Sequence, residues 1–464
     1  MVHQFKNNGY NIVLDVQSGA IHVVDEVTYD LIAIFENNSK EYVVDEIHKK
    51  YTDIPVEEIE EIYDEVQELV DDESLFTPDI YEDKIAEFST RRETVVKALC
   101  LHIAHDCNLA CRYCFADEGT YNGQKRELMP LEVGKQALDF LIENSGNRKN
   151  LEVDFFGGEP TLNWDVVKAL VEYGREREKE TGKNFRFTLT TNGVLLNDEM
   201  MEFANKEMHN VVMSVDGRKS VHDYMRPSRG GQPSYDRIMP KFKKFAESRN
   251  QMNYYARGTF TRNNLDFSED VISLANEGFK QISVEPVVAP PEADYSIREE
   301  DVPKILEQYD LLAKEMLRRY KTDEDFNFFH FMIDLEGGPC VYKRLSGCGA
   351  GTEYLAVTPQ GDLYPCHQFV GNEEFLMGNV REGLKNTELQ GKFKCANVYA
   401  KPECKNCFAR FYCSGGCQAN AYNFSGDILG NYAIGCELQK KRIECAIMLK
   451  AAEEEIDAER EENK

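Results

Sequence analysis

The fourteen cysteines of this chain are its most reactive residues, and they fall into two groups. Four lie at positions 100–114, none lies at 115–339, and ten lie from position 340 onward. Secreted disulfide scaffolds are short and rich in cysteine throughout, which does not describe a chain of 464 residues. The N-terminus is polar and lacks a signal sequence, so we expect a cytoplasmic protein. Clustered thiols in that reducing compartment indicate metal or redox chemistry.

The early group contains the loop Cys107-Asn-Leu-Ala-Cys111-Arg-Tyr-Cys114. Three thiolates on one loop can hold three irons of a [4Fe–4S] cube and leave the fourth iron open to another ligand. A zinc site with His102 or His105 as an additional ligand is the alternative. That alternative is weaker, because zinc sites usually combine two pairs of ligands.

A regular framework must position this loop, and the middle of the chain alternates strands with amphipathic helices. We expect strands at 97–104, 151–156, 185–190, 210–215, 254–260 and 281–287. Six such repeats predict a parallel sheet covered by helices, closed into a partial (β/α)6 barrel of the TIM type. Reactive groups in such barrels lie on the loops after the carboxyl ends of strands, and the cysteine loop follows the first strand.

The C-x3-C-x2-C loop in this position resembles the radical S-adenosylmethionine (SAM) enzymes. The next strand ends in Phe156-Gly157-Gly158-Glu159-Pro160, which matches the GGEP motif of that family. The resemblance implies that this turn binds the amino group of SAM. Glycines allow the backbone to approach closely, and Glu159 offers a carboxylate to an ammonium group.

Polar residues at the ends of the third and fourth strands extend the resemblance. It implies that Ser214 and Arg226, followed by Asn192 and Asp216, contact the ribose and carboxylate of SAM. Such residues also cap helices, which is the structural alternative for each of them.

The late cysteines resemble the seven-cysteine SPASM extension of radical SAM enzymes. The resemblance implies a first auxiliary [4Fe–4S] cluster on Cys348, Cys366 and Cys417, and a second on Cys404, Cys407, Cys413 and Cys436. Seven thiolates leave one cluster corner vacant. Either Cys340 fills it, or an open iron remains that could capture a substrate thiolate. If the resemblance to the family is set aside, the alternative for these cysteines is a zinc module. We expect Cys100, Cys395 and Cys445 to be buried thiols.

The formal net charge of −28 is concentrated at the two ends of the chain. Residues 1–90 carry −18 and residues 451–464 carry −5, which argues against binding of nucleic acid or anionic membranes. A hairpin at 11–24 followed by three helices predicts a winged-helix-like α+β domain. It resembles the PqqD-like domains that bind the leader of a precursor peptide as an added strand, and its charge predicts a basic leader. A dimerisation domain or a purely structural domain is the alternative.

These patterns divide the chain into six parts. We expect a PqqD-like domain at 1–80, a linker at 81–95, the barrel at 96–290, a helical connector at 291–336, a SPASM domain at 337–440, and a C-terminal helix with an acidic tail at 441–464.

The combination most resembles the thioether-forming maturases of six-cysteines-in-forty-five-residues (SCIFF) peptides. The resemblance implies three [4Fe–4S] clusters, SAM, an electron donor such as ferredoxin or flavodoxin, and a Cys-rich precursor peptide. The product would be a sactipeptide or a ranthipeptide, depending on which carbon is linked. An anaerobic sulfatase-type maturase is the alternative within the family. A non-catalytic iron–sulfur electron carrier and a zinc scaffold are the alternatives from other classes.

Overall fold

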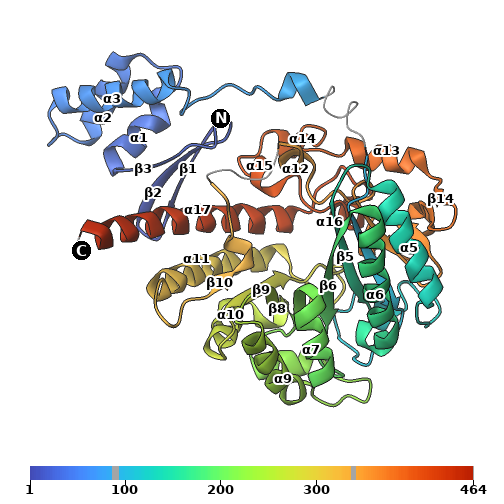
Figure 1. Ribbon diagram of the computed structural model, residues 1–464. Helices are drawn as coiled ribbons and strands as arrows, with labels where there is room; N and C mark the ends of the chain where they lie inside the picture. Colours follow the sequence, from blue (N-terminus) through green and yellow to red (C-terminus); the bar gives the residue numbers. More distant parts are fainter. Residues whose placement is uncertain (86–93, 336–340, 463–464) are drawn as a thin grey trace.

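The N-terminal unit combines a three-stranded antiparallel sheet with three helices (Figure 1). The structure is a computed structural model and describes residues 1–85, 94–335 and 341–462. The elements of this unit are β1 (Val2–Asn7), β2 (Tyr10–Asp15), β3 (Ile21–Val24), α1 (Glu26–Phe35), α2 (Lys40–Lys50) and α3 (Val56–Asp71). The predicted hairpin and helices are confirmed, but β1 was missed. Its signal was the dipeptide Asn8-Gly9, which is typical of a two-residue hairpin turn because both residues adopt positive φ, here 47° and 93°.

Both faces of the small sheet are buried, one against the main core and the other against the helices of the N-terminal unit. Ile12 and Leu14 of β2 join the main core of the protein, whereas Val13 between them packs with α1–α3. This alternation is the period-2 pattern of a strand. The N-terminal unit is therefore packed directly onto the rest of the chain.

The predicted parallel sheet forms the centre of the molecule. Its strands are β4 (Ala98–Ala104), β5 (Asn150–Gly157), β6 (Asn184–Thr191), β7 (Met208–Ser214), β8 (Tyr254–Phe260) and β9 (Gln281–Pro286), paired in chain order. The covering helices are α5 (Leu131–Asn144), α6 (Trp164–Thr181), α7 (Asp198–Glu207), α8 (Lys219–Met225), α9 (Tyr235–Ser248), α10 (Phe267–Asn276) and α11 (Val302–Arg319). All six predicted strands are present. Local signals set the ends of the helices: the Asn197 side chain caps the start of α7, and Gly182, at φ 70°, ends α6.

The sheet continues beyond the six predicted strands at both edges. The short strand β10 (Asn327–Phe328) adds to β9, and β11 (Tyr354–Val357) adds to β4 in the parallel direction. The antiparallel strands β12 (Asp362–Tyr364), β13 (Gly378–Asn379) and β14 (Gly383–Leu384) follow. The cysteine-rich region is thus joined to the barrel by backbone hydrogen bonds, a connection that was not predicted.

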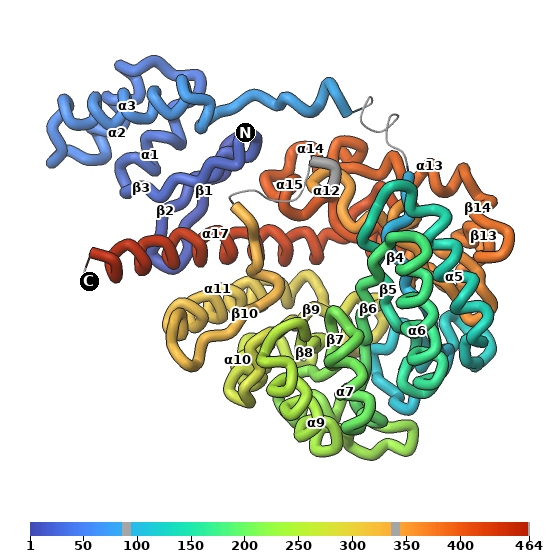
Figure 2. Tube along the Cα trace, viewed as in Figure 1, coloured from blue at the N-terminus to red at the C-terminus, as the bar shows by residue number. Residues whose placement is uncertain are grey.

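A long C-terminal helix, α17 (Ala433–Glu462), lies between the N-terminal unit and the barrel (Figure 2). It packs along α11, and the His3 ring on β1 lies 3.0 Å from a carboxylate oxygen of Glu444. Tyr10 donates a hydrogen bond of 2.6 Å to Glu455. The helix therefore extends through most of the region predicted as an acidic tail, since Glu462 is its last residue.

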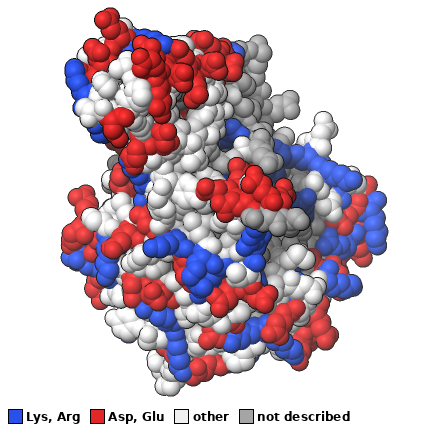
Figure 3. Space-filling view, turned by 90° about the vertical axis from the view of Figure 1, so that its left-hand side faces the viewer, with Lys and Arg blue, Asp and Glu red and all other residues white. Residues whose placement is uncertain are grey.

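Acidic side chains dominate the visible face of the N-terminal unit at the top of Figure 3. This distribution agrees with the negative charge of residues 1–90. Among the described residues, no helix has the length and apolar character needed to span a membrane.

Candidate functional site

The three early thiols face a cavity at the carboxyl ends of the parallel strands. Cys107, Cys111 and Cys114 follow β4 and line a cavity of about 290 Å³. The amide of Cys114 donates a hydrogen bond of 3.1 Å to the carbonyl of Cys111, which folds the loop back on itself. The predicted loop therefore lies where barrel chemistry is expected.

Burial favours the protonated form of all three thiols. Burial, with smaller contributions from nearby cysteine thiols, raises the pKa of the Cys107 and Cys111 thiols to about 12. Thiols with such a high pKa become thiolates when a positive metal centre binds them. The three sulfur donors thus have the chemistry of iron–sulfur ligands.

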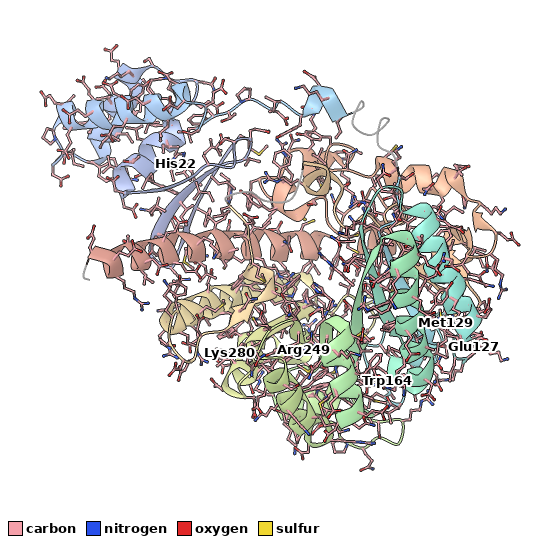
Figure 4. All side chains as sticks on the ribbon, viewed as in Figure 1. His22, Glu127, Met129, Trp164, Arg249 and Lys280 are labelled. Carbon is pink, nitrogen blue, oxygen red and sulfur yellow. The ribbon has the colours of Figure 1, made fainter. Side chains whose placement is uncertain are left out.

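The glycine turn after β5 is fastened to the cysteine loop. The amide of Gly158 donates to the carbonyl of Ala104 at 2.7 Å, and the amide of Glu159 donates to the carbonyl of Asp106 at 2.9 Å. A Cβ on Gly157 would lie 2.4 Å from the Ala104 oxygen, and one on Gly158 would lie 2.1 Å from the Asp106 oxygen. Both positions require glycine, and both line the cavity. The 3₁₀ turn Pro160–Asn163 then leads into α6, which begins at Trp164 (Figure 4).

The Glu159 carboxylate is buried and joins the ends of two strands. It accepts hydrogen bonds from the Thr191 hydroxyl at 2.8 Å and from the amides of Asn192 and Thr161 at 2.7 Å and 3.1 Å. Burial raises its pKa, although these hydrogen bonds act in the opposite direction. Glu159 also lines the cavity, and these hydrogen bonds hold its carboxylate in place.

Three of the other four predicted SAM contacts, Asn192, Ser214 and Arg226, line the same cavity. Asp216 is not among the lining residues and is fully buried. Its carboxylate accepts hydrogen bonds from the Tyr113 hydroxyl at 2.7 Å and from Arg226 Nε at 3.0 Å. We therefore assign Asp216 the task of orienting Arg226 and Tyr113, not of contacting a ligand.

Several cavity residues were missed in the sequence. They include Tyr113, Arg257, Thr259, Glu285 and His367. The available signal was strand periodicity: Arg257 and Thr259 are two residues apart on β8 and therefore face the same side of the sheet. His367 is brought to the cavity by the cysteine-rich region, which no local pattern could place.

The late cysteines lie in two groups. Burial raises the pKa of Cys366, and the nearby thiols of Cys417 and Cys348 add to that rise. In the second group, burial raises the pKa of Cys413 to about 12, with further contributions from Cys436, Cys404 and Cys407. The two groups have the same members as the two predicted ligand sets. Cys340 lies outside the described residues.

The three remaining cysteines differ in exposure. Cys100 and Cys445 are buried, as expected, but Cys395 is exposed at the end of α13 (Thr387–Cys395), so its predicted burial is wrong. A helix end at the surface leaves such a side chain in contact with solvent.

Comparisons with known proteins agree with this geometry. Residues 101–257 match the Radical SAM superfamily, and residues 348–408 match the iron–sulfur cluster-binding domain named SPASM. The chain is 23% identical to the radical SAM cyclopropyl synthase TigE of Paramaledivibacter caminithermalis, over 74% of this chain and 72% of that protein. It is also 23% identical to a cysteine-type anaerobic sulfatase-maturating enzyme of Clostridium novyi, over 68% of this chain and 86% of that enzyme.

Two solved structures share the fold. The enzyme anSMEcpe with bound AdoMet superposes with a TM-score of 0.64 at 20% identity, over 77% of this chain and 99% of that chain. Streptococcus suis SuiB bound to its precursor peptide SuiA superposes with a TM-score of 0.52 at 17% identity, over 92% of this chain and 97% of that chain.

Proposed function

Because the chain carries a radical SAM core of TIM-like α/β fold and a C-terminal SPASM domain, we propose that it is a peptide maturase that forms thioether cross-links. Its substrate would be a ribosomally made Cys-rich precursor peptide. The reaction would join a Cys sulfur to a carbon of an acceptor residue. The observation that carries this proposal is that Cys107, Cys111 and Cys114 line the same cavity as the glycine turn.

The sulfur donors define where the cofactors would bind. Cys107, Cys111 and Cys114 would hold the cluster that binds SAM, and the two late groups would hold the auxiliary clusters. When bound, these groups supply one-electron chemistry: reductive cleavage of SAM and removal of a hydrogen atom from a peptide carbon. Each cross-link would remove two hydrogens from the peptide: the carbon hydrogen would leave in 5′-deoxyadenosine and the thiol hydrogen as a proton, with the remaining electron accepted by the auxiliary clusters.

The residues of this chain would orient and shield that chemistry. Arg226 would hold the SAM carboxylate, while Asn192 and Ser214 would contact the ribose. Asp216 would keep Arg226 aimed at the cavity by accepting hydrogen bonds from Arg226 Nε at both carboxylate oxygens. Excluding water from such a cavity protects a reactive intermediate from side reactions.

The N-terminal unit would bind the leader of the precursor peptide. The strand order β1-β2-β3 leaves β3 at the edge of the small sheet, and Val23 on that strand is 52% exposed. An exposed edge strand can pair with an extended peptide. The unit is acidic, so we expect the leader to be basic and its binding to weaken as salt rises.

A sulfatase-type maturase, which would oxidise a Cys or Ser to formylglycine, is the second candidate, because sulfatase-maturating enzymes are among the relatives. The solved SuiB complex, whose protein is bound to a precursor peptide, aligns with more of this chain than anSMEcpe does. That difference supports the precursor-peptide function, in which the N-terminal unit would bind the leader.

Anaerobic reconstitution tests the proposal. The protein should bind about twelve irons, which is three four-iron clusters, and should form 5′-deoxyadenosine when it is reduced in the presence of SAM. A candidate precursor peptide should lose two hydrogens per link in mass spectrometry. Nearly stoichiometric zinc without 5′-deoxyadenosine would contradict radical chemistry. An unchanged peptide mass would contradict cross-linking, and formylglycine in a sulfatase peptide would favour the second candidate.

A further inference from the structure

One wall of the cavity is formed by residues outside the motifs assigned to SAM. Arg257 on β8 and Glu285 on β9 both line the cavity, together with the cysteine loop. Arg257 Nη2 donates a hydrogen bond of 2.8 Å to Glu285 Oε2. Their side chains remain 49% and 39% exposed, so both charged groups are accessible from the cavity.

This pair differs from the other charged pair at the site. Arg226 and Asp216 are 11% and 0% exposed, and Arg226 Nε contacts both carboxylate oxygens. That pair is part of the folded framework. In the Arg257 pair, the second oxygen, Oε1 of Glu285, lies 3.8 Å from the His330 ring, beyond hydrogen-bonding distance. Within the described part of the chain, the bond to Glu285 is the one hydrogen bond of the Arg257 side chain.

The arrangement offers a hydrogen-bond donor and an acceptor side by side. Burial raises the pKa of Glu285, but the Arg257 guanidinium, with smaller contributions from His330 and Arg442, lowers it more, to about 2, so the carboxylate is ionised and accepts hydrogen bonds. The two opposite charges make the pair neutral overall. A ligand of one charge is attracted by one member of the pair and repelled by the other, whereas an uncharged group with both a donor and an acceptor gains a hydrogen bond from each member.

We propose that Arg257 and Glu285 hold the main chain of one extended residue of the substrate. Arg257 donates to the carbonyl oxygen of that residue and Glu285 accepts from its N–H, which point to the same side of an extended chain, and this fixes its α-carbon in the cavity. The pair is therefore a positioning element for the acceptor residue, whatever side chain that residue carries. This inference rests on the proposed function, because it requires a peptide in the cavity.

The chain contains a matched control pair. Arg186 on β6 and Glu152 on β5 are 3.3 Å apart and 39% and 40% exposed, close to the values of the cavity pair. They are directly opposite each other in the parallel sheet. Neither residue lines the cavity. Substitutions in this pair therefore test the effect of breaking such an ion pair where no substrate is expected.

The test compares Arg257→Lys and Glu285→Gln with Arg186→Lys and Glu152→Gln in the reconstituted holoenzyme. Three quantities are measured: SAM affinity, affinity for a synthetic precursor peptide in the presence of SAM, and the ratio of cross-linked peptide to 5′-deoxyadenosine. We expect the cavity variants to bind SAM as the wild type does. Their peptide affinity and coupling ratio should fall about tenfold, which corresponds to about 1.4 kcal/mol. The control variants should match the wild type.

Two results would overturn the inference. In the first, the cavity variants keep wild-type peptide affinity and coupling ratio. In the second, they lose SAM affinity and keep their peptide affinity. The second result would assign Arg257 to SAM. If the wild type cleaves SAM and leaves the peptide unmodified, the proposed thioether function fails. Peptide affinity then still decides whether the pair binds the peptide, so the two failures are distinguishable.

Discussion

Asp79 accepts a hydrogen bond of 2.9 Å from Arg410, and this contact ties the segment after α3 to the cysteine-rich region. Arg410 lies between Cys407 and Cys413 in sequence, and its side chain is 3% exposed. The Tyr399 hydroxyl also donates to Asp79, at 2.9 Å. Asp79 is thus one of the contacts between the N-terminal part of the chain and the loop proposed to carry the second auxiliary cluster.

Substituting Asp79 should loosen that link. Asp79→Asn keeps the shape but loses the charge on its bond to buried Arg410, so we expect a loss of about 1.5–3 kcal/mol of stability. Hydrogen exchange should increase over residues 399–413. The control is Glu82→Gln, which breaks the exposed Lys405–Glu82 pair and should change stability by less than about 1 kcal/mol. Equal effects of the two substitutions would show that the Asp79 contact has no special role.

The same contact predicts a dependence on acid. Burial raises the pKa of Asp79, but hydrogen bonds from the Tyr81 amide and the Tyr399 hydroxyl, with the Arg410 charge, lower it overall. The folded state therefore keeps Asp79 ionised at a lower pH than the unfolded chain does. Its stabilisation is complete at neutral pH and is lost as the pH falls below about 4, through the folded pKa. The stability difference between the wild type and Asp79→Asn should shrink over that interval, and a constant difference in thermal unfolding would contradict the assignment.

Asp216→Asn should weaken SAM binding, although the Asp216 side chain does not line the cavity. The substitution leaves the nearly buried Arg226 without its charged partner, and breaking a buried ion pair costs about 3–5 kcal/mol. We expect a lower unfolding temperature and weaker SAM binding measured by titration. Asp236→Asn, which breaks an exposed pair with Lys219, is the control and should leave both quantities unchanged. Wild-type SAM affinity in Asp216→Asn would refute an orienting role.

Gly158→Ala should prevent assembly of the first cluster. Its Cβ would lie 2.1 Å from a backbone oxygen of the segment that leads into the cysteine loop, so that segment would have to move. We expect about four fewer irons per chain after reconstitution and loss of SAM cleavage. Gly391→Ala is the control because a Cβ there lies more than 4 Å from every atom outside its own helical turn. Position 391 is helical, so alanine should stabilise it by up to about 1 kcal/mol. A full iron content in Gly158→Ala would contradict this account.

Single cysteine substitutions should separate the three sulfur groups. Cys417→Ala and Cys413→Ala should each reduce the iron content by up to about four per chain, because each removes a ligand from a different proposed cluster. The spectroscopic signals that remain should differ between the two variants. Cys395→Ala, at an exposed position, should bind iron as the wild type does. Loss of the same signal in both variants would mean that the late cysteines form one site.

Much of the site could be predicted because its parts are local in sequence. The thiols of Cys107, Cys111 and Cys114 share one loop, and the glycine turn directly follows a strand. Parallel strands in chain order bring their carboxyl ends together, so the motifs after β4 and β5 had to meet. The six strands were visible for the same reason, since each is a short apolar segment followed by a helix.

Contacts between distant segments could only come from the tertiary structure. The sequence placed Asp216 among the SAM contacts, whereas packing buries it behind Arg226 and Tyr113. The pairing of β11 with β4, the position of His367 in the cavity and the contact of Asp79 with Arg410 each join residues more than 200 positions apart. Residue type and spacing determined which chemistry this chain can support. Long-range packing decided which side chains face the cavity, because burial and hydrogen bonding there depend on segments that no local pattern connects.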